Sequence, residues 1–278
     1  MGLRIATNTA SLVSQRALAN TTASQSKSFA RLSSGQRITS AGDDAAGLAI
    51  SENMRAQIRS MGQAERNASD GISFVQVAEG GLNEVGNILI RIRELGVQAA
   101  SDTIGDRERS FVDKEVQSLI SEVDRIASVT QFNGTPLLNG EAKSELSFQV
   151  GIRKENDDSD RIIFKPNEYN AKAAELGVEG LSYLSASDAR DSLNKVDDAL
   201  GKVFEARANL GATQNKLQST VSNIQVTKEN LAMARSRIAD TDVAAETAEM
   251  VQRNIMQSAG VSVLAQANMV PQQALKLL

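Results

Sequence analysis

The side chains that carry most enzyme chemistry are scarce in this sequence. Its 278 residues include no cysteine and no histidine, which removes thiolate nucleophiles, disulfides, the commonest general base and the commonest transition-metal ligand. Two carboxylate pairs, Asp43-Asp44 and Asp157-Asp158, lie in sequence typical of turns, so we interpret them as helix caps or solvated turn residues. No glycine loop with the Walker spacing occurs. The sequence therefore predicts a protein that is not an enzyme, with no catalytic or cofactor-binding residues, no cofactor and no metal site.

The sequence is instead dominated by a seven-residue repeat of apolar side chains in its C-terminal third. The repeat consists of Val196, Val203, Leu210, Leu217, Ile224, Leu231 and Ile238. On a helix this spacing forms one continuous stripe, which must be buried against another helix. At about 1.5 Å per residue the helix would be about 70 Å long. Such a helix predicts an elongated protein, and elongated proteins usually have structural or binding roles.

Two further stripes can cover this one within the same chain. The first consists of Met54, Met61, Ala68, Val75, Leu82 and Leu89, and the second of Val112, Val116, Leu119, Val123 and Ile126. Three amphipathic helices with complementary stripes can bury each other as a bundle. We therefore expect helices at about 45–100 and 105–129 to pack on the repeat helix, which Ser187 or Asp188 can cap. Coiled coils between separate chains are the alternative use of these stripes.

The composition agrees with a mainly α-helical fold and narrows the partners. Aromatic residues make up 3%, tryptophan is absent and there are only three prolines, so long uninterrupted helices are expected rather than a bulky globular core. A net charge of −4 argues against a nucleic-acid-binding surface. No apolar run reaches the roughly 18 residues of a membrane-spanning helix, and none follows Met1–Asn8 as in a signal peptide. We expect no membrane insertion, and either residence in the cell or export without a cleaved signal.

Residues 130–185 depart from the helical pattern. The sequence FNGTP at 132–136 is typical of a turn, because glycine readily adopts a positive φ. Apolar and polar residues alternate at Leu146–Val150, and more loosely at Arg161–Phe164, on either side of a charged segment. Two short strands around a polar tip predict a β-hairpin in the region from about 140 to 185.

The two ends of the chain carry weaker helical patterns. Residues 1–44 and 236–278 are rich in small polar side chains, and their apolar stripes are incomplete. Their candidate contact residues are Leu12, Leu18, Leu32, Ile38, Met250, Ile255, Leu264 and Leu278. Ordering such an arm costs more conformational entropy than its sparse stripe returns on burial. We infer that the arms are loosely ordered alone and fold when neighbouring subunits cover them.

A set of short motifs at both ends and along the helical body resembles bacterial flagellin. The N-terminal half contains LSSGQRI (32–38), AGDDAAGLAIS (41–51), RNASDGIS (66–73), QVAEG (76–80), RELGVQAA (93–100) and FNGTPLL (132–138). The C-terminal half contains RANLGA (207–212), SRIADTD (236–242), LAQAN (264–268) and PQ (271–272). As a set these motifs are highly specific.

The resemblance implies a structural subunit that polymerises into the bacterial flagellar filament used for swimming motility. It implies an inner domain of paired terminal helices, made of 1–44 and 236–278, and a helical rod domain at 45–235 that carries the hairpin. The segment from about 140 to 185 is short, so the large outer domains of many relatives should be missing. The resemblance also implies an extracellular location in the flagellum, reached by type III export without a cleaved signal peptide.

Several partners follow from the same resemblance. They are other copies in a helical homopolymer, an export chaperone on the C-terminal arm, and the cap and hook-junction proteins. Toll-like receptor 5 recognises many flagellins through an Arg and a Leu on one helix and a Glu on the next, and Arg91, Leu95 and Glu115 occupy those positions. Their spacing puts Arg91 and Leu95 on one helical face. Packing between subunits is the alternative role of these residues.

Two other functions remain open at the level of sequence. The hook–filament junction protein of the flagellum has ends that resemble flagellin, although it usually matches the family motifs less completely. A monomeric helical adaptor with a receptor-binding rod is the third possibility. The extent of the motifs favours the filament subunit.

Overall fold

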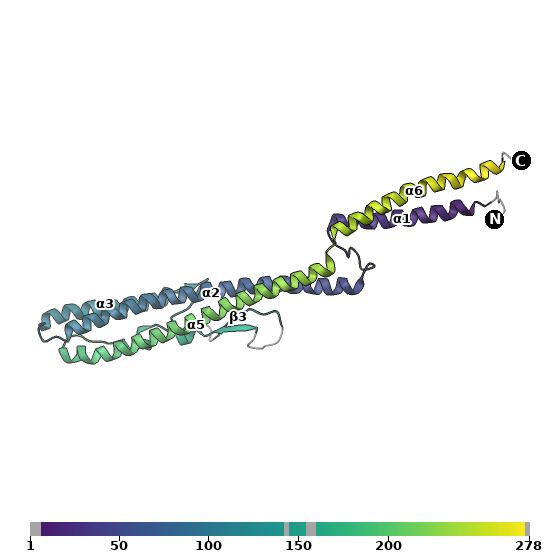
Figure 1. The fold of residues 1–278 in the computed structure, drawn as a ribbon. Coiled ribbons are helices and arrows are strands. Elements are labelled where there is room, and N and C mark those ends of the chain that lie inside the picture. The colour runs from purple at the N-terminus through teal and green to yellow at the C-terminus, as the bar shows by residue number, and fades with distance from the viewer. Residues whose placement is uncertain (1–6, 142–144, 154–159, 276–278) are drawn as a thin grey trace. The chain divides into compact units, whose positions relative to one another are not determined.

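The structure is a computed structural model that describes residues 7–141, 145–153 and 160–275 (Figure 1). Its elements are α1 (Thr9–Ser34), α2 (Ala45–Ala99), α3 (Asp106–Val129), β1 (Gln131–Phe132), β2 (Thr135–Pro136), β3 (Leu146–Gln149), β4 (Arg161–Phe164), the 3-10 helix η1 (Pro166–Tyr169), α4 (Ala173–Leu176), α5 (Ala186–Ala239) and α6 (Val243–Leu275). The expected mainly α-helical fold, with paired terminal helices and small antiparallel strand pairs, is confirmed.

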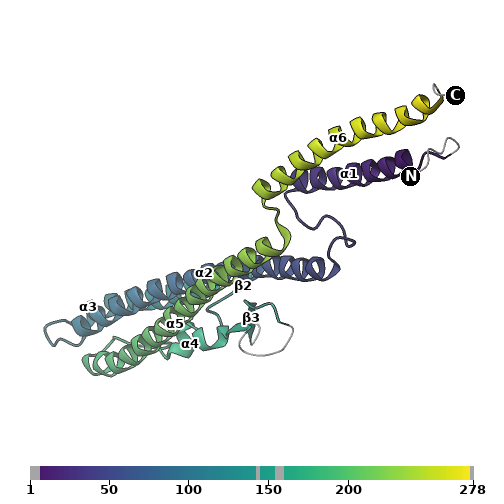
Figure 2. The same ribbon diagram turned by 45° about the vertical axis from the view of Figure 1, so that its right-hand side comes forward.

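The chain divides into two compact units. Unit 1 comprises residues 1–58 and 229–278, and unit 2 comprises residues 59–228. Both α2 and α5 contribute to each unit, because the division falls inside these helices. In unit 2 the helices α2 and α5 run side by side, with α3 along α2 (Figure 2).

The apolar stripes predicted from the sequence form the core of unit 2. Val203 and Leu210 of α5 are buried, together with Leu82 of α2 and with Val116 and Val123 of α3. The stripes therefore cover each other within one chain, as expected. The repeat of α5 becomes half-buried only where the helix enters unit 1, at Leu231 and Ile238.

Helix α2 continues without a break through its internal glycines. At Gly81 an added Cβ would lie 2.7 Å from Leu138 Cδ1 and 2.8 Å from Thr130 Oγ1, so this glycine lets the segment after α3 approach the helix closely. At the neighbouring Gly80 the same position is open. Burial of the α2 stripe against the rest of unit 2 therefore overrides the low helix propensity of glycine.

Phe74 of α2 contacts residues from both strand pairs. The Phe74 ring makes edge-on contacts with Phe132, Phe148 and Phe164, with centroid distances of 5.6, 5.4 and 4.9 Å. The predicted hairpin is confirmed: β3 and β4 are antiparallel, with Leu146 opposite Phe164. Of the charged segment expected at its tip, 154–160, residues 154–159 lie outside the described residues.

The segment between the hairpin and α5 is held on α3 by two carboxylates. Asp113 Oδ1 accepts a hydrogen bond from the amide of Tyr183 at 2.9 Å, and Asp124 Oδ1 accepts one from the amide of Ala173 at 2.8 Å. The prediction that Ser187 or Asp188 caps α5 was wrong. The helix begins at Ala186, and the Ser185 hydroxyl accepts from the Asp188 amide at 3.1 Å.

Candidate assembly and recognition surfaces

In unit 1 the terminal helices α1 and α6 pair along a seam with seven-residue spacing. They are antiparallel, with Asn8 against Ala267 at one end and Arg31 against Glu246 at the other (Figure 1). The positions withdrawn from solvent include 11, 14, 18, 21, 25, 28 and 32 on α1, and 246, 250, 253, 257, 260, 264 and 267 on α6. This spacing is that of a two-stranded coiled coil.

The seam between α1 and α6 is unusually polar. Ser11, Ser28 and Glu246 are buried in it, and among the apolar residues of the two helices up to residue 269, whose side chains the structure describes, only Ala267 is equally buried. The Asn8 side-chain amide donates to the Ala267 carbonyl at 2.9 Å, and the Ser11 hydroxyl donates to Asn268 Oδ1 at 2.8 Å. These hydrogen bonds satisfy some of the groups that pairing takes out of water, whereas Arg31 Nε and Glu246 Oε1 are buried without a hydrogen-bond partner.

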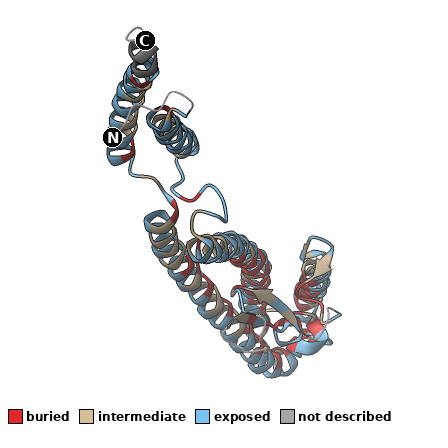
Figure 3. Ribbon diagram, turned by 90° about the vertical axis from the view of Figure 1, so that its right-hand side faces the viewer, coloured by how far each residue is buried: buried red, intermediate tan, exposed pale blue. Residues whose placement is uncertain are grey.

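Many of the large apolar side chains of the pair point outward instead. The exposed fraction of Leu12 is 55% and that of Ile255 is 65%. Other exposed apolar residues on the two helices are Val13, Phe29, Val243, Val251, Met256, Val261, Val263 and Met269. Figure 3 shows α1 and α6 mostly in the colour of exposed residues, whereas red is concentrated in unit 2. A helix pair with polar contacts inside and apolar residues outside presents a binding surface.

The remaining arm residues predicted from the sequence lie elsewhere. Leu18, Leu32, Met250 and Leu264 are half-buried along the seam rather than on the outer face. Ile38 is buried, with 4% of its surface exposed, in the segment that links α1 to α2. Leu278 lies outside the described residues.

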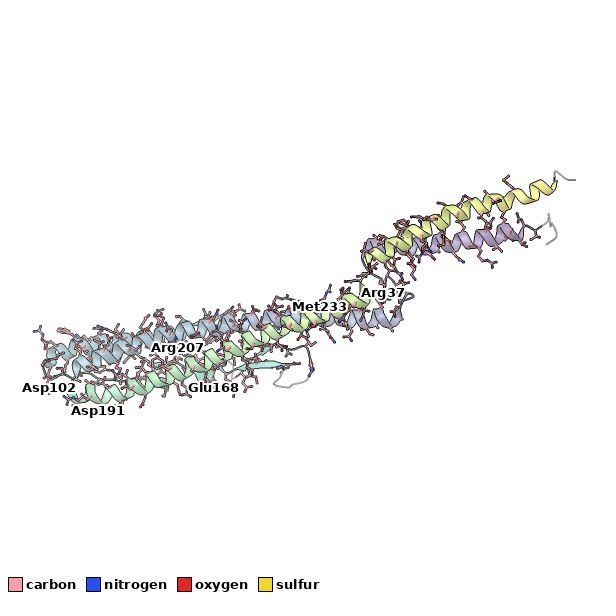
Figure 4. All side chains as sticks on the ribbon, viewed as in Figure 1. Arg37, Asp102, Glu168, Asp191, Arg207 and Met233 are labelled. Carbon is pink, nitrogen blue, oxygen red and sulfur yellow. The ribbon has the colours of Figure 1, made fainter. Side chains whose placement is uncertain are left out.

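The link between α1 and α2, residues 35–44, is tied to the end of α5. The Arg37 guanidinium donates through Nη2 to the Ile238 carbonyl at 2.8 Å, and the Arg37 amide donates to the Ala239 carbonyl at 2.7 Å (Figure 4). The Thr241 amide donates to the Gly35 carbonyl at 2.9 Å. The segment that follows α1 and the segment that precedes α6 are therefore fixed to one another.

The adjacent carboxylates in this link are structural, as predicted. Lys27 Nζ lies 2.6 Å from Asp43 Oδ1, and Asp43 Oδ2 accepts hydrogen bonds from Thr39 and Ser40. The contact with Lys27, followed by the hydrogen bond from the Thr39 hydroxyl, holds the pKa of Asp43 far below its ordinary value. Asp44 accepts from the Gly47 amide at 2.8 Å in the first turn of α2. The other pair, Asp157-Asp158, lies outside the described residues.

The residues predicted to form the receptor surface do not all reach it. Arg91 on α2 and Glu115 on α3 are exposed, and Arg91 Nη2 lies 3.0 Å from Glu115 Oε1. Arg91 also lies 3.1 Å from Glu94, and the hydrogen bonds to Glu115 and then to Glu94 raise its pKa. Leu95 has an exposed fraction of 2% and belongs to the core. Helix positions four apart differ by about 40°, which is enough to turn Leu95 inward.

One residue of the seam, Arg253, was not predicted from the sequence. It occupies the α6 stripe in phase with Glu246 and Gly260, where an apolar residue is the usual choice. The seven-residue spacing of Arg253 from Glu246 and Gly260 is the sequence signal that would have identified it as a seam residue.

The family is decided by comparison with known proteins. Residues 5–143 match the model for the bacterial flagellin N-terminal helical region, and residues 193–278 match the model for the bacterial flagellin C-terminal helical region. The chain belongs to the bacterial flagellin family. This is a family of structural proteins.

Individual relatives of this flagellin match over most of its length. The chain is 41% identical to the flagellar filament 31.3 kDa core protein of Treponema maltophilum, with 98% of each chain covered. It is 40% identical to a flagellin of Halalkalibacterium halodurans, with 91% of each covered. The crystal structure of Bacillus cereus flagellin matches with a TM-score of 0.51 and 26% identity, over 61% of this chain and 94% of that one.

In the described ranges of this flagellin, no helix is long and apolar enough to cross a membrane.

Proposed function

We propose that this flagellin assembles into its filament through the outward apolar faces of α1 and α6. The protein is a structural subunit of the bacterial flagellar filament, an extracellular appendage for motility. The observation that carries the proposal is the inverted polarity of the pair of helices α1 and α6: apolar Leu12 and Ile255 are exposed, while polar Ser11 and Ser28 are buried. Such a pair leaves apolar area in water until neighbouring copies cover it.

This assembly divides the chain into two domains by role. Residues 1–44 and 236–278 form the inner domain, and residues 45–235 form the outer helical-bundle domain with the hairpin. The contacts of Arg37 and Thr241 support these limits, because they join the two ends of the inner domain at residues 35–44 and 238–241. Copies associate head to tail without closing into a ring, which produces an open helical polymer.

The same exposed faces account for the partners that protect and receive the subunit. An export chaperone covers α6, whose Val251, Met256 and Val261 would otherwise bind other apolar surfaces before export. Export proceeds without a cleaved signal peptide. The cap and hook-junction proteins then contact the terminal helices at the two ends of the filament.

Toll-like receptor 5 is a further proposed partner, through the exposed pair Arg91 and Glu115. Their mutual contact presents one positive and one negative group side by side on α2 and α3. Leu95 acts by packing α2 in its position, since its side chain is buried. If Arg91→Ala with Glu115→Ala leaves receptor signalling at the level of the parent protein, this partner is wrong.

A truncated chain tests the assembly proposal. A protein lacking 1–44 and 236–278 is compared with the intact chain for growth on filament seeds. The truncated protein should remain monomeric and keep the helical circular dichroism of its bundle, because the core of unit 2 lies within 68–221. Filaments formed by the truncated protein would overturn the proposal. Electron microscopy with labelled subunits separates the filament subunit, found along the whole fibre, from a junction protein found only at its base.

A further inference from the structure

The polar seam of the terminal helix pair raises the question of how one register is chosen. The seam positions on both helices repeat every seven residues, so sliding α6 by one repeat, about 10.5 Å, brings a similar set of positions together. The larger apolar seam residues, such as Leu18, Leu32, Met250 and Leu264, are spaced too sparsely to forbid such a slide. Apolar packing alone therefore leaves the register weakly specified.

Arg253 is the residue of the seam whose contacts depend most on register. Its Nη1 donates to the Ser24 carbonyl at 2.7 Å and also to the hydroxyl of Ser28, which is fully buried. Its Nη2 lies 3.0 Å from Glu249 on its own helix, and its side chain is only 19% exposed. One guanidinium thus joins a carbonyl and a hydroxyl on α1 to α6.

A slide by one repeat in either direction breaks the contacts of Arg253 with Ser24 and Ser28 on α1, whereas its contact with Glu249 on the same helix is kept. One slide carries Arg253 toward the like charge of Arg31 at the end of α1. The opposite slide separates Glu246 from Arg31, its partner at 3.5 Å, and puts it beside Gln25. The first slide therefore brings two like charges together, and the second separates a buried carboxylate from the charge on α1 that compensates for its lost hydration.

We propose that Arg253 is the positioning residue that sets the register of α1 and α6. Asn254, the residue after Arg253, accepts a hydrogen bond from the Gln25 side chain on α1, and this contact supports the same alignment. The effect of the register on the filament rests on the proposed function. A slide of about 10.5 Å displaces the outward face of α6 relative to the outward face of α1, so a neighbouring copy can no longer fit both faces at once. The choice of register is measured separately from filament growth.

Cysteine pairs report the register directly, because the chain has no cysteine of its own. In the full chain, Leu18→Cys with Gly260→Cys reports the observed register, since Leu18 packs on Gly260. Leu18→Cys with Ala267→Cys reports a slide in one direction, and Ser14→Cys with Gln257→Cys reports the other. A thiol crosslinker shorter than about 8 Å distinguishes them, as one repeat is longer. Intrachain products keep the mass of the monomer.

Each cysteine pair is combined in turn with one of three substitutions. Arg253→Met removes the guanidinium, and Arg253→Lys keeps a charged donor. Arg16→Met is the control, on the exposed face of α1. Arg253→Met should raise the ratio of the Leu18–Ala267 crosslink to the observed crosslink about tenfold or more, while helical circular dichroism persists, because this is the slide that carries Arg253 toward Arg31. Arg253→Lys and Arg16→Met should keep the observed register predominant. Filament growth on seeds should fall only for Arg253→Met.

Two results would overturn the proposal. The first is that Arg253→Met retains only the observed crosslink at the parent yield. The second is loss of all three crosslinks together with helical signal, which means that Arg253 stabilises the pair without choosing its register. Failure of the proposed function looks different: filament growth would be unchanged for a variant whose crosslinks have moved to a slid register.

Discussion

Leu18 on α1 packs against Gly260 on α6, with its Cδ1 atom 3.5 Å from the point where a Cβ on Gly260 would stand. That distance is an ordinary van der Waals contact, so the helices do not require a glycine here. The close approach of two helices is therefore not what holds the terminal pair together. Hydrogen bonds and half-buried apolar side chains such as Leu18 join the two helices inside, and much of the apolar surface of the pair is left for other chains.

Gly260→Ala should stabilise the terminal pair. Alanine removes the conformational cost of a glycine inside a helix, about 0.5–1 kcal/mol, and its methyl group fits against Leu18. Thermal melting of the full chain, followed by circular dichroism, should show a higher midpoint for the least stable helical transition. Gly35→Ala is the opposite control, because Gly35 ends α1 with a φ of 68°. A lower midpoint for Gly260→Ala would contradict the contact described.

Two adjacent glycines of α2 should respond in opposite directions. Gly81→Ala forces a Cβ to within 2.8 Å of Thr130 Oγ1 and should destabilise unit 2 by about 1–3 kcal/mol. Gly80→Ala meets open space and should stabilise it by about 0.5–1 kcal/mol. Urea unfolding gives both free energies. Equal effects of the two substitutions would mean that residues 130–138 do not approach α2 as closely as observed.

Tyr183 should remain protonated in the folded protein at pH 10, and Tyr169 should ionise above its ordinary pH range. Burial, then the charge of Asp113, raises the pKa of Tyr183 to about 12, and burial first of all raises that of Tyr169. Because a tyrosine in the unfolded chain ionises near pH 10, stability present below that pH should be lost between pH 10 and 12. Tyrosinate absorbance against pH measures this without interference, since tryptophan is absent. Half-maximal absorbance at pH 10 with unchanged helicity would refute it.

The helices were predictable from the sequence because burial follows a regular period. Val203 in α5 and Val116 in α3 each belong to an apolar stripe with helical spacing. Such a stripe can be recognised from its own segment of sequence, without knowledge of distant residues. The hairpin followed in the same way from alternation at 146–149. The prediction missed Ser185 as the cap of α5, because several hydroxyl and carboxyl side chains near the start of the helix are equally good candidates in the sequence.

Contacts that depend on three-dimensional distance were not predictable. Arg109 is buried and donates to the carbonyls of Ala99 and Ser101 at the end of α2, although arginine in a helix normally indicates a solvated face. The inward turn of Leu95 depends on how α2 is rotated against α3. The burial of polar residues and exposure of apolar residues in α1 and α6 could be recognised only once the two helices were seen together, because the stripe of each helix alone is incomplete.

The most direct test of assembly through the outward faces of α1 and α6 changes those faces without shortening the chain. Leu12→Gln with Ile255→Gln replaces two exposed apolar side chains and leaves the seam intact, and Leu12→Val with Ile255→Val is the matched control. The measurement is the lowest protein concentration at which filaments grow on seeds. The glutamine variant should require about tenfold more protein or higher, since each apolar side chain buried contributes about 1.5–3 kcal/mol, and the valine variant should behave nearly as the parent. Growth of the glutamine variant at the parent concentration would contradict the account.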